Sequence, residues 1–260
     1  MIDHTFKKKF GQNFLQDNNI INKIANVCET TKDDLIIEIG PGSGALTEKI
    51  VEKSPVLAYE IDLELKENLT NKFVDKKIDF IFDDFLNRNL KQDLSKYKYH
   101  NLYVIANLPY YITTPIITKI IEEKLDVNKM VLMVQKEVGD RFNAKVGTKD
   151  YSSISIFLNY YFDVKKEFIV SRNAFYPMPN VDSIILSFSK KIDKPKVNDE
   201  NKFFKLIRDS FKQKRKTLKN NLKEYDFSKI EEILIKNKLP TDVRAEKISL
   251  EVFCEISNNL

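Results

Sequence analysis

The sequence has 260 residues, of which 42% are hydrophobic and 31% charged, and its formal net charge is +5. This length allows one substantial core and a small second domain, while the charge favours an acidic partner only weakly. Two cysteines without CxxC spacing and only two histidines argue against a disulfide framework, a metal centre and histidine acid–base catalysis. Because the N-terminus is charged and no run of about 18 apolar residues exists, we expect a cytoplasmic protein without a signal peptide or membrane span. We take a monomer as the default.

The first part of the chain alternates apolar runs with helical spacing. Residues 17–29 are predicted to form a helix that begins after Asp17 as its N-cap. Strands are expected at 35–40, 56–61, 78–84, 102–107 and 129–135, and helices at 43–53, 62–74, 114–124 and 136–143. This alternation predicts a mainly parallel sheet with helices on both faces.

The second part changes from strands to helices. Residues 152–162 fit a helix or a strand, and we favour a helix followed by a strand at 163–170. The alternating run at 182–191 is predicted to end the sheet as one arm of an antiparallel pair. After a polar linker at 193–201, the spacing is helical through 202–223, 227–237 and 248–258. We therefore predict one domain over 1–192 and a small helical domain over 193–260.

A glycine-rich turn follows the first expected strand of the sheet, in EIGPGSGALT (38–47). Gly40, Gly42 and Gly44 permit unusual dihedral angles and a close approach of the backbone to a ligand. A turn of this kind is compatible with a dinucleotide, an adenosyl cofactor or merely a tight turn.

Two acids follow at the tips of the next two strands. Glu60 ends VLAYE, and a carboxylate there can accept hydrogen bonds from both hydroxyls of a ribose. Asp84 ends IFDD and can accept the exocyclic amine of an adenine, whereas alternation directs Asp83 to the other face of the strand. Each acid alone could be a solvated strand end, but the glycine turn and the two acids, at the tips of three successive strands, together favour a nucleotide site. A nicotinamide cofactor stays open at this point, although the turn is GPGSG and not GxGxxG.

The run LYVIA (102–106) is followed by NLPY (107–110). With NLPY added to the glycine turn and the two acids, the sequence resembles the ribosomal RNA adenine dimethyltransferases, most closely their small-subunit (KsgA/RsmA) type. The matching motifs occur in the order of the family and span nearly the whole chain: KKKFGQNFL (7–15), EIGPGSGALT (38–47), YEID (59–62), DDFL (83–86), NLPYYITTPI (107–116), FYPMPNVDSIILSF (175–188) and QKRKTLKNNL (213–222). The resemblance implies a Rossmann-like class I methyltransferase domain that binds S-adenosyl-L-methionine, followed by an RNA-contacting helical domain. It also implies dimethylation of the N6 amine of adjacent adenosines in small-subunit (16S) ribosomal RNA, during biogenesis of that subunit.

The resemblance gives NLPY a chemical role. An adenine amine is a poor nucleophile, and in the family two acceptors take its hydrogens, here the side-chain oxygen of Asn107 and the carbonyl of Leu108. Pro109 fixes the turn without offering an N–H group. Tyr110 would stack on the base, a contact worth about 1–3 kcal/mol. Phe175 is either a second wall for the base or an ordinary core residue.

The family also uses GQNFL (11–15) to close over the cofactor, which assigns cofactor contacts to Asn13 and Leu15. Asn107 is expected to contact the cofactor too, together with Gly40, Gly42, Glu60 and Asp84. Because the sulfonium already activates the methyl group, the enzyme has mainly to align amine, methyl and sulfur. The two oxygen acceptors would stabilise positive charge as it develops on nitrogen. This chemistry requires neither a metal nor a covalent nucleophile.

Residues 202–223 contain nine Lys or Arg residues and one acid, Asp209. A solvated helix face is the plain interpretation, but this local excess favours contact with RNA phosphates, for which Arg215 and Lys216 are the candidates. The target adenine must be unpaired or flipped out. The expected partner is small-subunit ribosomal RNA in an assembling subunit.

Three alternatives remain at the level of the sequence. The nearest is the antibiotic-resistance type of methyltransferase, which modifies adenine in large-subunit RNA, although NLPY, FYPMPNVDS and QKRKTLKNNL favour the small-subunit type. The second is a non-catalytic RNA-binding assembly factor, which the intact motifs disfavour. The third is a nicotinamide oxidoreductase, which NLPY and the basic C-terminal region disfavour.

Overall fold

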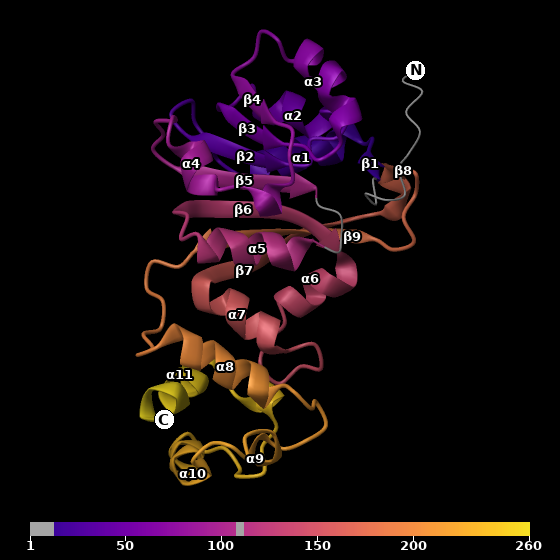
Figure 1. The fold of residues 1–260 in the computed structure, drawn as a ribbon. Helices are drawn as coiled ribbons and strands as arrows, with labels where there is room; N and C mark the ends of the chain where they lie inside the picture. The colour runs from indigo at the N-terminus through magenta and orange to yellow at the C-terminus, as the bar shows by residue number, and fades with distance from the viewer. Residues whose placement is uncertain (1–12, 108–111) are drawn as a thin grey trace. The chain divides into compact units, whose positions relative to one another are not determined.

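A computed structural model describes residues 13–107 and 112–260 (Figure 1). The described residues form two compact units, one containing the chain up to Gly139 together with Lys165–Ser189, and the other Asp140–Val164 together with Lys190–Leu260. This division differs from the predicted boundary at 192/193, because residues 140–164 share a core with the C-terminal helices. The functional roles assigned to the two domains remain predictions.

The first unit is organised around a β-sheet. Among the described residues, seven strands form this sheet in the order β4-β3-β2-β5-β6-β9-β7. Their bounds are β2 Leu35–Ile39, β3 Val56–Tyr59, β4 Ile78–Ile81, β5 Leu102–Asn107, β6 Val127–Gln135, β7 Phe162–Val170 and β9 Ser183–Lys190. The strands from β4 to β6 are parallel and β9 is antiparallel to β6, which confirms the mainly parallel sheet. Strand β9 does not end the sheet, however, because β7 lies beyond it.

Sequence explains why these strands are central. All five residues of β2 are buried, as in a strand covered on both faces, and a continuous apolar run is typical of parallel sheets. Ile36, Ile105 and Val131 belong to a cluster that also contains apolar residues of α1 and α2. Buried isoleucines of α5 lie outside this cluster, and Figure 1 shows α5 on the near side of the sheet. Helices therefore cover both faces.

The helices of this part of the chain mostly lie where the pattern predicts them. Their bounds are α1 Asn18–Val27, α2 Ala45–Ile50, α3 Lys66–Lys72, α4 Leu90–Leu94, α5 Thr113–Glu122 and α6 Lys136–Phe142. The N-cap prediction is confirmed, since the Asp17 carboxylate accepts hydrogen bonds from the backbone N–H groups of Asn19 and Ile20 at 2.8 and 3.2 Å. The helix predicted at 62–74 is divided into a 3₁₀ turn at Leu63–Leu65 and α3.

A second, two-stranded sheet joins distant parts of the sequence. Strand β1 (Phe14–Leu15) pairs antiparallel with β8 (Phe175–Tyr176), with Leu15 opposite Phe175. The Gln16 N–H group extends the pairing by donating to the Ala174 carbonyl at 2.9 Å. The sequence did not predict this pairing, which links the GQNFL segment to the FYPMP segment.

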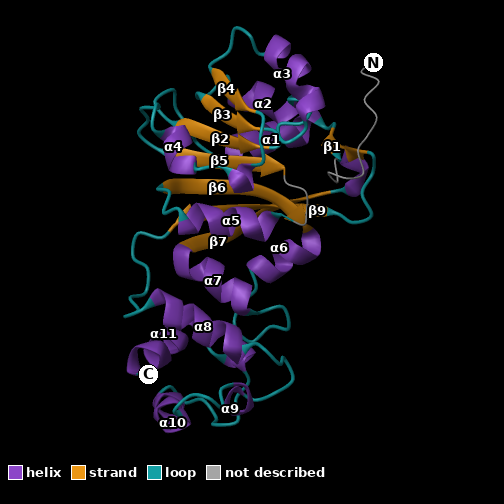
Figure 2. Cartoon of the chain, in the orientation of Figure 1, coloured by secondary structure: helices purple, strands orange, loops and turns teal. Residues whose placement is uncertain are grey.

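The second unit is helical. It contains α7 (Ser153–Tyr161), α8 (Glu200–Ser210), α9 (Leu218–Asn221), α10 (Phe227–Lys236) and α11 (Leu250–Asn259). The helical pattern predicted through 202–223 is interrupted, because α8 ends at Ser210 and α9 begins at Leu218, with a loop drawn between them in Figure 2. In the part of the chain that the structure describes, no helix is long and apolar enough to cross a membrane.

Candidate active site

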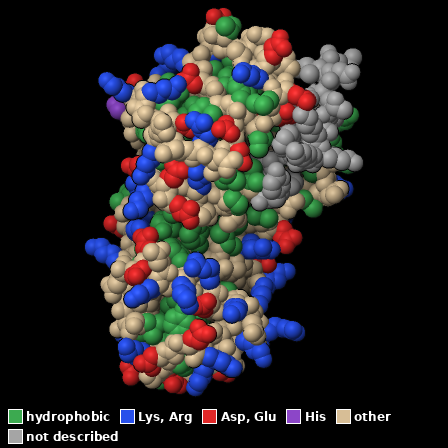
Figure 3. Space-filling view, in the orientation of Figure 1, with side chains coloured by type: hydrophobic (Ala, Val, Ile, Leu, Met, Phe, Trp, Pro, Cys, Tyr) green, Lys and Arg blue, Asp and Glu red, His purple; other side chains and the backbone are tan. Residues whose placement is uncertain are grey.

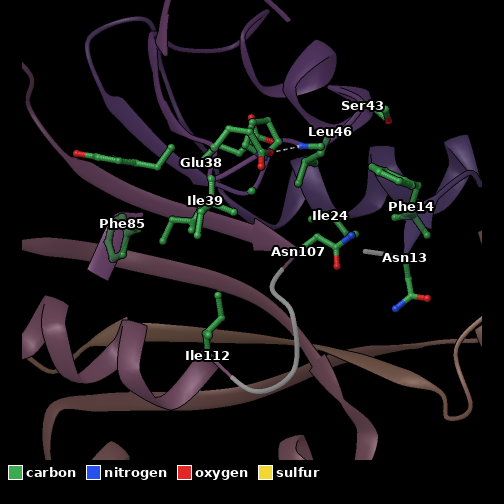
Figure 4. Close-up of a pocket in the computed structure, with 18 of the residues that line it drawn as sticks. Asn13, Phe14, Ile24, Glu38, Ile39, Ser43, Leu46, Phe85, Asn107 and Ile112 are labelled. Atoms are coloured by element: carbon green, nitrogen blue, oxygen red, sulfur yellow. Dashed lines mark hydrogen bonds between the residues drawn. The ribbon is translucent and has the colours of Figure 1, made fainter. Parts of the chain in front are cut away.

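A cavity of about 330 Å³ lies in the first unit, at the carboxyl ends of β2, β3, β4 and β5. Open parallel sheets generally bind ligands at this edge. The sequence-predicted residues that line it are Asn13, Leu15, Gly40, Gly42, Glu60, Asp84, Asn107 and Phe175. Figure 4 shows that the labelled side chains Asn13, Glu38 and Asn107 come from different segments of the chain. The structure thus brings together residues far apart in the sequence.

The glycine-rich turn has a conformation that only glycine adopts easily. The φ angles of Gly40, Gly42 and Gly44 are +73°, +57° and +79°. A Cβ atom on Gly42 would also lie 2.9 Å from the Cε1 atom of Phe14, which is too close for any real contact. The backbone conformation therefore favours glycine at position 42, and the Phe14 ring that packs on it would have to move to admit a Cβ atom.

Glu60 lies at the end of β3 with only 3% of its surface exposed. Its Oε2 accepts the Gly42 N–H group at 3.0 Å and its Oε1 accepts the Asp62 N–H group at 2.9 Å. Burial is the main reason why the pKa of the Glu60 carboxyl lies above its ordinary value. Each oxygen keeps a further lone pair, so the carboxylate can still accept hydroxyl groups of a ligand.

The Asp83–Asp84 pair takes up two different roles in the structure. Asp84 is partly buried, and its Oδ1 accepts the Leu86 N–H group at 2.9 Å at the start of a 3₁₀ turn. Asp83 also borders the cavity, but its exposed carboxylate bonds Arg88 at 3.2 Å and the Asp84 N–H group at 2.8 Å. Arg88 in turn bonds both carboxylate oxygens of Asp93, at 2.6 and 3.1 Å. Arg88 thereby fixes the turn that carries Asp84.

Asn107 ends β5 and borders the cavity next to the glycine turn. Its backbone carbonyl lies 3.9 Å from the place where a Cβ atom on Gly40 would be. Leu108, Pro109 and Tyr110, the remaining residues of NLPY, lie outside the described residues, and their predicted roles stay predictions. Phe175 lines the cavity with 5% of its surface exposed, so it is both a wall of the cavity and a core residue.

The N-terminal residues reach the cavity through β1. Leu15 is buried at 8% exposure and pairs with Phe175, while Asn13 precedes the strand and borders the cavity. The β1–β8 pairing therefore places the predicted cofactor contacts beside the predicted base wall.

Glu38 also lines the cavity, and sequence analysis did not single it out. It is 1% exposed and its Oε2 accepts the Thr47 hydroxyl at 2.7 Å. Burial, with a smaller contribution from the nearby Glu60 charge, raises the pKa of Glu38 to about 8. The signal was present as an acid within the apolar run LIIEIG, nine residues before a threonine on the following helix.

Arg215 and Lys216 belong to the second unit, where they are exposed in the loop between α8 and α9. Figure 3 shows many Lys and Arg side chains in the lower part of the view, where Figure 1 draws α8 to α10. Among the described residues, no group of three or more His, Cys, Asp or Glu side chains is arranged to hold a metal ion.

The sequence matches the model of a family described as ribosomal RNA adenine dimethylase over residues 3–260. The chain belongs to this family. It is also 44% identical to ribosomal RNA small subunit methyltransferase A of Streptococcus gordonii, over 98% of this chain and 92% of that protein. The protein of the same name from Lactococcus lactis subsp. lactis is 42% identical, over 99% of this chain and 91% of that protein.

Two solved structures have the same fold as this adenine dimethylase. The 23S rRNA methyltransferase ErmE superposes with a TM-score of 0.77 at 22% identity, over 95% of this chain and 99% of ErmE. A dimethyladenosine transferase from Plasmodium falciparum gives a TM-score of 0.76 at 24% identity, over 94% of this chain and 95% of that protein. The predicted Rossmann-like class I methyltransferase fold is confirmed, and the chain is an rRNA adenine dimethyltransferase.

Proposed function

We propose that this dimethylase transfers methyl groups from S-adenosyl-L-methionine to the N6 amines of adjacent adenosines in small-subunit (16S) ribosomal RNA, in an assembling subunit. The observation that carries the proposal is the convergence of Gly42, Glu60, Asp84 and Asn107 on one cavity. The choice of subunit is supported by the names of the relatives at 42–44% identity, whereas ErmE at 22% identity shares only the fold. The large-subunit alternative and a non-catalytic role are therefore not favoured.

The residues around the cavity fit an adenosyl cofactor. The glycine turn permits close approach of a ligand to its backbone, Glu60 has lone pairs for the ribose hydroxyls, and Asp84 can accept the adenine amine. Asn13 and Leu15 close the cavity from the N-terminal side. When bound, S-adenosylmethionine would supply a methyl group already activated by its sulfonium.

The target amine would meet the cavity at Asn107. In the proposed arrangement, the Asn107 side-chain oxygen and the Leu108 carbonyl accept the two amine hydrogens and leave the nitrogen lone pair free for the methyl group. Tyr110 and Phe175 hold the flipped adenine between them. Because the walls of the cavity restrict the approach, alignment contributes most of the rate enhancement. The proton leaves the nitrogen to water after transfer.

The proposal is tested by transfer of radiolabelled methyl groups to undermethylated small ribosomal subunits, with large-subunit RNA in parallel. Label recovered as dimethyladenosine in the small-subunit RNA is expected. Label in the large-subunit RNA alone would indicate that the protein is a methyltransferase of the antibiotic-resistance type. Cofactor binding without label in either RNA would favour the alternative of a non-catalytic assembly factor.

A further inference from the structure

The loop between α8 and α9 carries the two cations predicted to contact RNA. Residues 212–216 are all exposed, and in the described part of the chain neither Arg215 nor Lys216 forms an ion pair with a carboxylate. Exposed loops of this length normally sample many conformations. Two long cations on such a loop would lose much conformational entropy on binding. The hydrogen bonds that fix the loop therefore bear on its affinity for RNA.

Asn221, in the short helix that follows the loop, holds the beginning of the loop. Its Nδ2 donates to the Ser210 carbonyl at 2.7 Å and to the Gln213 carbonyl at 3.2 Å. Its Oδ1 accepts the Gln213 N–H group at 3.2 Å. The Asn221 side chain thus satisfies a carbonyl at the end of α8 and both backbone groups of Gln213.

Other bonds hold the rest of the loop. The Lys216 N–H group donates to the Gln213 carbonyl at 3.0 Å, so the position of Gln213 helps to fix the backbone of Lys216. The Leu218 N–H group donates to the Val243 carbonyl at 2.7 Å at the exit from the loop. The Lys214 ammonium donates to the Lys149 carbonyl at 2.6 Å, which ties the middle of the loop to residue 149.

We propose that Asn221 is a positioning residue for RNA binding, which holds the 211–217 loop so that Arg215 and Lys216 meet neighbouring phosphates as a preformed pair. This inference rests on the proposed function, because it takes the RNA phosphates as the partner of the loop. Asn221 itself needs no contact with RNA. Its contribution is to lower the entropy that the two cations lose on binding.

A purely structural role for Asn221 would give different results, and Asn237 provides the matched control. The Asn237 Nδ2 donates to the Ile233 carbonyl at 2.9 Å near the end of α10, and to a Glu255 carboxylate oxygen at 2.9 Å. Both asparagines thus bond backbone carbonyls near the end of a helix in the second unit, but Asn237 does not bond the basic loop.

The test is a double-mutant cycle on binding to undermethylated small subunits, measured across a range of salt concentrations. The cycle contains the wild type, Asn221→Ala, Arg215→Ala/Lys216→Ala and the triple variant, with Asn237→Ala as control. Asn221→Ala should weaken binding about three- to tenfold, the effect of leaving one or two side chains unordered. Removing the two cations should flatten the salt slope by about 0.7–0.9 per lost contact.

The decisive result is the triple variant. If Asn221 acts through Arg215 and Lys216, its substitution should have no further effect once both cations are absent. Equal losses in both backgrounds, or an equal loss in Asn237→Ala, would overturn the proposal. Unchanged binding in Asn221→Ala would overturn it as well. Hydrogen exchange at the Gln213 amide should become faster in Asn221→Ala, which verifies that the loop was loosened in a folded protein.

Methyl transfer by the wild type separates this inference from the proposed function. Transfer to small-subunit RNA with additive effects in the cycle would refute only the role of Asn221. Absence of transfer by the wild type would refute the proposed function, whatever the cycle shows. Unchanged binding on removal of both cations would refute the RNA role of the loop and the role of Asn221 together.

Discussion

Replacement of Gly42 by Ala tests whether the glycine turn and the N-terminal strand form one cofactor-binding surface. At φ +57°, an L-residue is less stable than glycine by about 1–2 kcal/mol. The added methyl group would also lie 2.9 Å from Cε1 and 3.3 Å from Cδ1 of Phe14, so the ring must move away. The movement would disturb β1 and the bond between the Gly42 N–H group and Glu60.

Gly147 is the control because its φ angle is also positive, while an added methyl group there would meet no close neighbour. Its φ angle is +86°, and a Cβ atom there would meet only the Lys247 side chain, at 3.8 Å from Nζ. Both Gly42→Ala and Gly147→Ala should therefore lower the free energy of unfolding by about 1–2 kcal/mol. Only Gly42→Ala should weaken binding of S-adenosylmethionine, by about tenfold, which corresponds to about 1.4 kcal/mol.

Isothermal titration with the cofactor and urea unfolding of the same samples would measure the two effects separately. The reasoning fails if Gly42→Ala loses stability but binds the cofactor as the wild type does. It also fails if Gly147→Ala weakens cofactor binding to the same extent, since strain alone would then explain the loss.

Three further predictions follow from the site. Asn107→Ala should nearly abolish methyl transfer while changing cofactor affinity much less, and full activity in this variant would refute the proposed acceptor role. The pKa of Glu38 is raised by burial to about 8 from an ordinary 4.5, so the folded protein keeps a proton that the unfolded chain releases. The contribution of Glu38 to the free energy of unfolding is fully present below about pH 4.5 and is lost as the pH rises through about 8. In urea unfolding between about pH 5 and 8, Glu38→Gln should therefore flatten this decline of stability with pH. Arg88→Gln leaves the nearly buried Asp93 carboxylate without its cation, and should lower the free energy of unfolding by about 1–3 kcal/mol; an unchanged urea midpoint would show that Arg88 does not stabilise this turn.

Much of the cavity was predictable because parallel strands bring their carboxyl ends to one edge. Glu60, Asp84 and Asn107 lie at or just after the ends of three successive strands, and each therefore lies at that edge whatever the details of the loops. The β1–β8 pairing was not predictable, because a strand of two residues has no periodicity and its partner lies about 160 residues away in the sequence.

The interruption of the helix predicted through 202–223 has a similar cause. The spacing of apolar residues continues across the loop, so periodicity alone predicts one helix. Asn221 lies beyond the loop, and its side-chain amide caps the end of α8 by bonding the Ser210 carbonyl. A bond made by a side chain eleven residues away has no local signature in the sequence.

The division of the chain between its two units has consequences for truncated fragments of the protein and for its folding during synthesis. The backbone passes from one unit to the other at 139/140, 164/165 and 189/190. A fragment ending at residue 192 would keep α7 but deprive Ile156 and Tyr160 of the core that Phe203, Leu206 and Phe253 share with them, so we expect it to aggregate. During synthesis, the first unit cannot complete its sheet until β9 has emerged, because this strand lies between β6 and β7. The first 190 residues must therefore leave the ribosome before the methyltransferase sheet can be completed.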